Sequence, residues 1–253
     1  MKLKDYVIRA LALGLFVYWG MSSIVMDVSI NQVFAQDKAT QDMINHLEQL
    51  LEATGSYRGD VATIFEDGKE INGKVKFKWP NMRWQENRFP RKHGSFHTVY
   101  IISNGTIRWN YMPGLNIALK YDKKARHEDA QQKGWFSADI IDKASLQYVR
   151  KEQLDGEEVS VFESKPSALL KHENPDPPGT TRFYIGAKDG IMRKIVTYNP
   201  EGRETGSQIF SNIRIDPSIS DKDFEFDPPE GTQIHEVKEV DQKIRIPFRA
   251  IGK

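Results

Sequence analysis

Cysteine is absent from all 253 residues of the chain, which excludes disulfide bonds and metal sites built on thiolates. An excess of charge of either sign is missing too, since 36 Lys and Arg residues stand against 35 Asp and Glu residues. A chain this close to neutrality exerts little electrostatic attraction on nucleic acid or on an anionic membrane. We therefore expect no nucleic-acid partner.

Long apolar runs are scarce as well, and the single one lies near the start. Three basic residues among the first nine are followed by the uncharged stretch 10–26 and then by the small residues Val33 and Ala35. This order is typical of a secretory signal peptide, here residues 1–35. We predict cleavage after Ala35 and a periplasmic location; an uncleaved membrane anchor is the alternative. No cysteine follows the run, so a lipid anchor on an N-terminal cysteine is excluded.

Cleavage after Ala35 leaves 218 of the 253 residues. This length suits a single β domain, because β sandwiches and barrels often reach about 200–250 residues. We predict one domain over 36–237 and a C-terminal tail over 238–253. The domain begins with a helix over 36–55, in which apolar residues follow helical spacing on one face. Thr40 is the expected N-cap and Gly55 the expected stop.

From Tyr57 onward the apolar period changes to two. In 71–79, apolar residues alternate with lysines, which predicts a strand with one face buried and one face in water. Similar runs recur at 82–87, 96–103, 106–112, 115–121, 145–151, 157–165, 180–186, 191–199 and 204–215. Pairs such as Asn104-Gly105 separate them and are strong hairpin signals. We expect a mainly β fold of about eleven strands, antiparallel because tight turns join consecutive strands.

A twisted sheet of this width curls, and large barrels enclose space that side chains do not fill. We predict an apolar ligand site in this interior; an ordinary core is the alternative. The segment 123–144 interrupts the strands and is predicted to be a helix or a lid-like loop. The residues expected to line the interior are Val75, Phe77, Trp79, Met82, Trp84, Ile107, Trp109 and Tyr111.

Three segments resemble those of one known family. Residues 78–84 read KWPNMRW, residues 102–111 read ISNGTIRWNY, and residues 224–231 read FEFDPPEG. Their order resembles the LolA-like family of periplasmic carriers for outer-membrane lipoproteins, over about residues 40–234. The resemblance implies an incomplete antiparallel β-barrel, lidded by helices, that holds acyl chains. The family arginine that latches the lid falls at Trp79, so a latch in this chain would be rebuilt around Arg83.

Catalytic chemistry has no recognisable pattern in the sequence. No nucleophile, base and orienting group occur at the spacing of a known motif, and the acidic cluster at 221–227 lacks the spacing of a calcium loop. We therefore expect no enzyme activity, no metal and no cofactor. The expected protein is a monomeric carrier of lipoprotein or lipid acyl chains, with an inner-membrane donor and an outer-membrane acceptor. An envelope sensor of lipidated ligands is the first alternative, and an unrecognised hydrolase the second.

Overall fold

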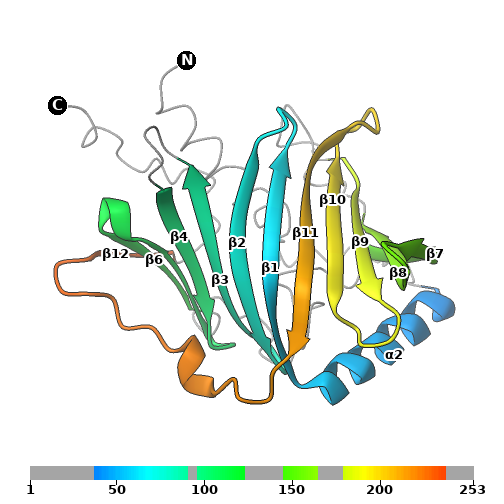
Figure 1. Ribbon diagram of the computed structural model, residues 1–253, viewed down its shortest axis with the longest axis horizontal. Coiled ribbons are helices and arrows are strands. Elements are labelled where there is room, and N and C mark those ends of the chain that lie inside the picture. The colour runs from blue at the N-terminus through cyan, green and yellow to red at the C-terminus, as the bar shows by residue number, and fades with distance from the viewer. Residues whose placement is uncertain (1–36, 91–95, 123–144, 165–178, 238–253) are drawn as a thin grey trace, which may run out of the picture.

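The computed structural model describes residues 37–90, 96–122, 145–164 and 179–237 (Figure 1). The predicted signal peptide, lid and C-terminal tail lie outside these ranges. One α-helix is described, α2 (Lys38–Thr54). The remaining elements are β1 (Ser56–Phe65), β2 (Glu70–Lys78), β3 (Met82–Pro90), β4 (Phe96–Ser103), β5 (Ile107–Met112), η2 (Pro113–Leu115), β6 (Ile117–Asp122), β7 (Leu146–Leu154), β8 (Glu157–Ser164), β9 (Thr181–Gly186), β10 (Met192–Tyr198), β11 (Glu204–Ile215), η6 (Asp221–Phe224) and β12 (Gln233–Glu236).

Helix α2 lies within the predicted range 36–55, but its N-cap is a different residue from the one expected. Asp37 is the N-cap, and its carboxylate accepts a hydrogen bond from the Thr40 amide at 2.7 Å. The prediction of Thr40 as N-cap is therefore wrong. Thr40 is buried, and its hydroxyl accepts from the backbone N–H of Tyr148 at 2.9 Å, which ties the helix to β7. The predicted stop is confirmed, because Gly55 takes a positive φ of 74° at the C-cap.

The twelve strands of the described residues form one sheet, in the order β12-β6-β5-β4-β3-β2-β1-β11-β10-β9-β8-β7. Two antiparallel meanders, β1–β6 and β7–β11, are joined where β1 pairs with β11. The edge strands β12 and β7 do not pair, so the predicted mainly β fold with an incomplete barrel is confirmed. Two details differ from expectation: β12 is a twelfth strand, and it pairs with β6 in parallel.

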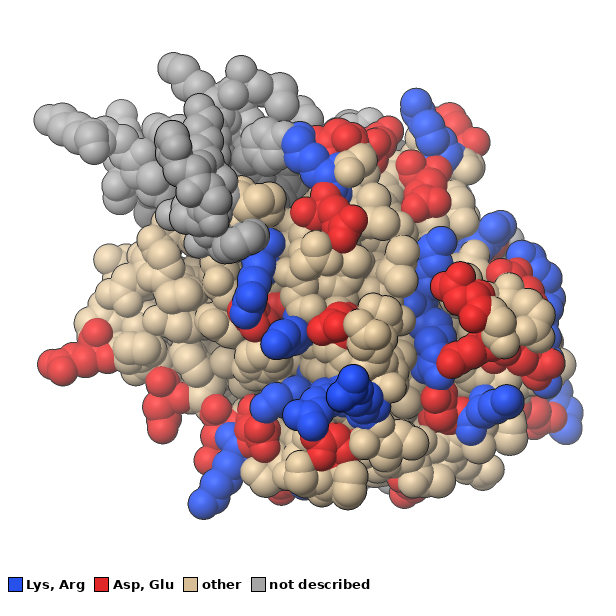
Figure 2. Space-filling model, in the orientation of Figure 1, with Lys and Arg blue, Asp and Glu red and all other residues tan. Residues whose placement is uncertain are grey.

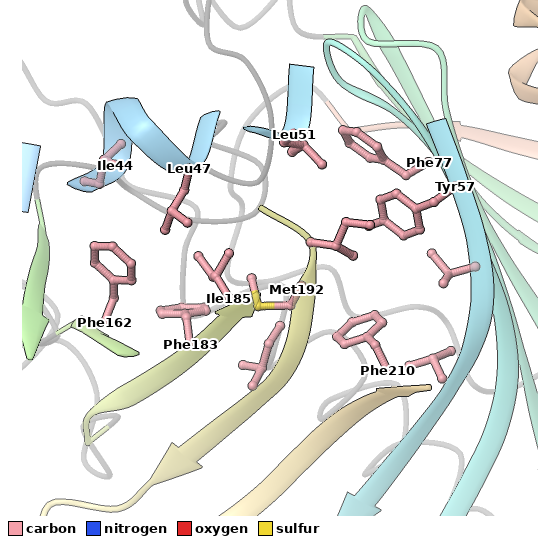
Figure 3. Packing of buried hydrophobic residues seen from close by; sticks show 14 of the residues in the cluster. Ile44, Leu47, Leu51, Tyr57, Phe77, Phe162, Phe183, Ile185, Met192 and Phe210 are labelled. Atoms are coloured by element: carbon pink, nitrogen blue, oxygen red, sulfur yellow. The ribbon is translucent and has the colours of Figure 1, made fainter. Parts of the chain in front are cut away.

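The main core lies between α2 and one face of the sheet, which we call the helix face (Figure 3). Leu47 and Leu51 of the helix meet Tyr57 of β1 and Phe77 of β2, whose rings stack with centroids 5.3 Å apart. The same cluster reaches β7–β11 through side chains such as Phe183. Helix α2 is thus anchored on the β7–β11 half of the sheet together with β1 and β2.

Residues 216–232, which we call the strap, run from the lower end of β11 past the ends of neighbouring strands to β12 (Figure 1). Their contacts lie on the face of the sheet opposite to the helix face. The strap leaves β11, passes through η6 and ends at β12. Lys76 of β2 pairs with Asp223 at 2.6 Å, and Lys78 pairs with Asp221 at 2.7 Å. Phe224 is only 1% exposed. These contacts fix the strap to the lysine side of β2, which we call the strap face.

Candidate functional site

The structure does not bring the eight predicted interior residues to one face. Strand pairing places Arg83 opposite Phe77 and Trp84 opposite Lys76. Residues directly opposite in a sheet share a face, so Phe77 and Trp84 lie on different faces. The prediction of one shared interior is wrong, because a change of one residue in turn length or register reverses the faces. Helix-face residues are Val75 and Phe77, with Trp79 packed against the main core, whereas strap-face residues are Met82, Trp84, Ile107, Trp109 and Tyr111.

On the strap face the aromatic side chains pack against one another and against the strap. The Phe226 ring lies 5.0 Å from Tyr111 and 5.7 Å from Trp109, centroid to centroid. Tyr100 bridges Tyr111 at 6.3 Å and Trp84 at 5.9 Å. These rings are half-buried. Trp109 and Tyr111, which the sequence analysis predicted to line the interior, therefore pack against the strap.

The helix face of β3–β6 carries a band of polar side chains. Phe77, Arg83, Ser103, Arg108 and Tyr121 stand opposite one another across β2–β6 and form one row. The next row along the strands consists of Val75, Gln85, Ile101, Asn110 and Leu119. Arginine, glutamine and asparagine side chains thus lie side by side on this face.

Both arginines of this band are buried, Arg83 with 4% and Arg108 with 6% of its surface exposed. Arg83 donates a hydrogen bond to the side-chain oxygen of Gln85. The Arg108 guanidinium lies over the Tyr121 ring, 4.2 Å from its centroid, a geometry in which the ring face attracts the cation. The predicted lid latch at Arg83 stays a prediction, because the predicted lid segment lies outside the described residues.

A second apolar cluster lies beyond this band on the same face. Its buried members come from β4, β5, β6 and the end of β12: Val99, Met112, Leu119, Tyr121 and Val237. Phe89, Leu115 and Ile117 pack against it. No residue of α2 belongs to this cluster. The described helix therefore packs over one half of the helix face, and the second half has a buried apolar cluster of its own.

Tyr57 lies where the main core meets the polar band. Burial raises the pKa of its hydroxyl well above the usual range, and the nearby Arg83 and Arg193 cations offset this in part. The phenol therefore stays neutral at every physiological pH.

The described residues contain no group of three His, Asp or Glu side chains placed to hold a metal ion. Within the same ranges, no helix is both long enough and apolar enough to cross a membrane. On the face in view in Figure 2, acidic and basic side chains are interspersed over the sheet. Such mixing gives no single-sign patch on that face for a polyanion.

Comparisons with known proteins bear on the fold. No protein family and no curated protein matches the sequence. An uncharacterized conserved protein from Thermus thermophilus has a similar structure, with a TM-score of 0.53 at 11% identity over 79% of this chain and 100% of that chain. A chain of the Pseudomonas aeruginosa MucA/MucB complex scores 0.43 at 15% identity, over 75% and 61% of the two chains.

The LolA superfamily protein NE2245 from Nitrosomonas europaea is a third structural neighbour. It scores 0.35 at 14% identity, over 74% of this chain and 97% of that chain. At 11% identity, the likeness to the Thermus thermophilus protein describes the fold alone.

Several residues of the helix face were missed by sequence reasoning, namely Arg108, Asn110, Met112 and Tyr121. Arg108, Asn110 and Met112 alternate with Trp109 and Tyr111 along β5, and Tyr121 of β6 stands opposite Arg108. The pairing register of the strands reveals them, because it shows which residues of neighbouring strands share a face. Trp84 and Trp109 both oppose Ile102, which puts the two indoles on one face and their polar neighbours on the other.

Proposed function

We propose that this chain is a periplasmic, non-enzymatic carrier that binds acyl chains of lipids or lipoproteins on the helix face of its open sheet. The observation that carries the proposal is the second apolar cluster, which α2 does not pack against. An acyl chain would pack among these buried apolar side chains of β4–β6, in surroundings of the kind that apolar ligands prefer. Each methylene removed from water contributes about 0.8 kcal/mol.

The LolA-like resemblance of the sequence supports the same function and suggests lipoprotein cargo. It also supports an inner-membrane donor and an outer-membrane acceptor as partners. A sensor that reads lipidated ligands would use the same binding face. Transfer distinguishes the two, because a carrier loaded with a labelled acyl chain delivers it to acceptor vesicles, whereas a sensor retains it.

The test is displacement of a fluorescent fatty-acid probe from the protein lacking residues 1–35. Met112 is 1% exposed within the second cluster, and Met112→Gln replaces its side chain by one of similar size. We expect about tenfold weaker probe binding, since an unpaired buried amide costs about 1–3 kcal/mol. Tyr111→Gln is the matched control, because Tyr111 is the next residue on β5 and points to the strap face. Equal affinity of wild-type and folded Met112→Gln protein would overturn the proposal.

A further inference from the structure

We propose that the buried polar band on the helix face is a binding site for an oxyanion attached to an acyl chain, a carboxylate or a phosphate. The inference rests on the proposed function and adds a ligand class to it. Arg83 and Arg108 supply the cationic groups, and Asn110 and Tyr121 supply further polar atoms. The ligand is then an anionic amphiphile and not any apolar molecule of the right length.

The two arginines converge because of strand register. Arg83 opposes Ser103, and Ser103 opposes Arg108, so one small residue separates the two cations in a row across β3, β4 and β5. Two strand spacings put their Cα atoms about 10 Å apart. Long guanidinium side chains can close on a group placed over the serine. Guanidinium groups bind carboxylate and phosphate oxygens through paired hydrogen bonds.

The electrostatics of this face favour an anion. The helix-face positions of β2–β6 carry two arginines, and none of the described residues at these positions is Asp or Glu. The carboxylates of these strands, such as Glu86, point to the strap face. A positive region away from bulk water strengthens charge-assisted hydrogen bonds.

Two further polar atoms point to a ligand. The side-chain oxygen of Asn110 and the hydroxyl of Tyr121 are buried and have no hydrogen-bond partner among the described residues. Asn110 is 8% exposed and Tyr121 is 4% exposed. Buried polar groups are normally paired, so each of these two atoms has a hydrogen bond to offer to a water molecule or to a ligand. The Tyr121 hydroxyl can donate to an oxyanion, whereas the Asn110 oxygen can only accept, for example from a hydroxyl group of the same ligand.

Apolar side chains on the neighbouring strands continue beyond this band. On β3 the helix face passes the polar Gln85 and Asn87 before it reaches Phe89, six residues or roughly 20 Å from Arg83, whereas β4 presents the apolar Ile101 and Val99 alongside. Phe89 packs against the second apolar cluster together with Leu115 and Ile117. An amphiphile with its head at the arginines can therefore lay its tail over Val99 and Met112. Head and tail sites lie on one face, in the order that such a molecule requires.

The test compares ligands that share a tail and differ in head charge. Oleate is compared with oleyl alcohol, and oleoyl lysophosphatidate with monooleoylglycerol, each by displacement of an uncharged fluorescent acyl probe from the protein lacking residues 1–35. We expect each anionic ligand to bind about tenfold more tightly than its neutral counterpart, since a hydrogen bond to a charged group is worth about one order of magnitude in affinity. A preference confined to oleate or to the lysophosphatidate identifies the carboxylate or the phosphate as the head.

Variants assign the preference to the band. Arg83→Gln and Arg108→Gln should each reduce the preference for the anion and leave binding of the neutral ligand nearly unchanged. Arg58→Gln is the control, because Arg58 lies on the strap face with 59% of its side chain exposed. Equal binding of anionic and neutral ligands by the wild-type protein overturns this inference even if neither variant folds. Failure of every ligand to bind overturns the proposed function instead.

Discussion

Helix α2 packs directly against Gly190 in the turn between β9 and β10. We expect that replacing this glycine by alanine displaces the helix. Gly190 has a φ of 68°, and a Cβ atom built on it would overlap the Leu47 carbonyl oxygen and lie 2.9 Å from the Leu51 nitrogen. Both obstacles are backbone atoms, so the helix itself must move. Gly190→Ala should cost about 1–2 kcal/mol for the left-handed backbone and about 1–3 kcal/mol for overpacking, or about 2–5 kcal/mol altogether.

A matched control separates the two terms. Gly202 occupies the next hairpin with a φ of 80°, and a Cβ atom there meets no described atom within 4 Å. Gly202→Ala should therefore cost only the backbone term. The measurement is the free energy of unfolding in urea for both variants, with circular dichroism to verify the fold. Equal losses would refute the reasoning, because they would mean that α2 is not held against this turn.

Three further predictions follow from the two faces of the sheet. Phe77→Ala should lower the free energy of unfolding by about 3–5 kcal/mol, and Trp84→Ala by less than half of that, since Trp84 is half-buried on the strap face; comparable losses in urea would contradict the face assignment. The hydrogen bond from Lys76 lowers the pKa of Asp223 from 3.8 to about 2. This contact therefore stabilises the fold fully above pH 3.8, and its contribution is lost as the pH falls through 2. An acid titration followed by tryptophan fluorescence should show this loss in the wild-type protein and lack it in Asp223→Asn. Phe226→Ala should raise the accessibility of tryptophan to acrylamide, and unchanged quenching would show that the strap does not cover the indoles.

The strands could be predicted from the sequence because each buries one face and exposes the other to solvent, which makes apolar and polar residues alternate. Alternation located β1–β11 closely, and the apolar stripe located α2 together with its end at Gly55. The twelfth strand could not be found in this way. All four residues of β12 are exposed, and β12 pairs in parallel with β6 at an edge of the sheet, so no alternation marks it.

The faces could not be predicted, because alternation fixes which residues of one strand share a side but not how two strands align. The register of β2 and β3 depends on the turn between them, which contains a cis Trp79-Pro80 bond. The turn consists of the three residues 79–81, and no pattern in the sequence specifies this number. A four-residue turn over 79–82 would have paired Phe77 with Trp84 and so placed both on the predicted interior face.

The strap gives the aromatic residues of β5 a partner within the chain. A bare row of half-exposed rings on a sheet would attract other chains. Phe226 covers two of these rings, and the Lys76–Asp223 pair holds the covering segment at its η6 end. Because these rings already pack against Phe226, an amphiphile would have to displace the strap in order to bind there. The face left to it carries two buried arginines and a second apolar cluster, and the charge dependence of ligand binding tests that assignment directly.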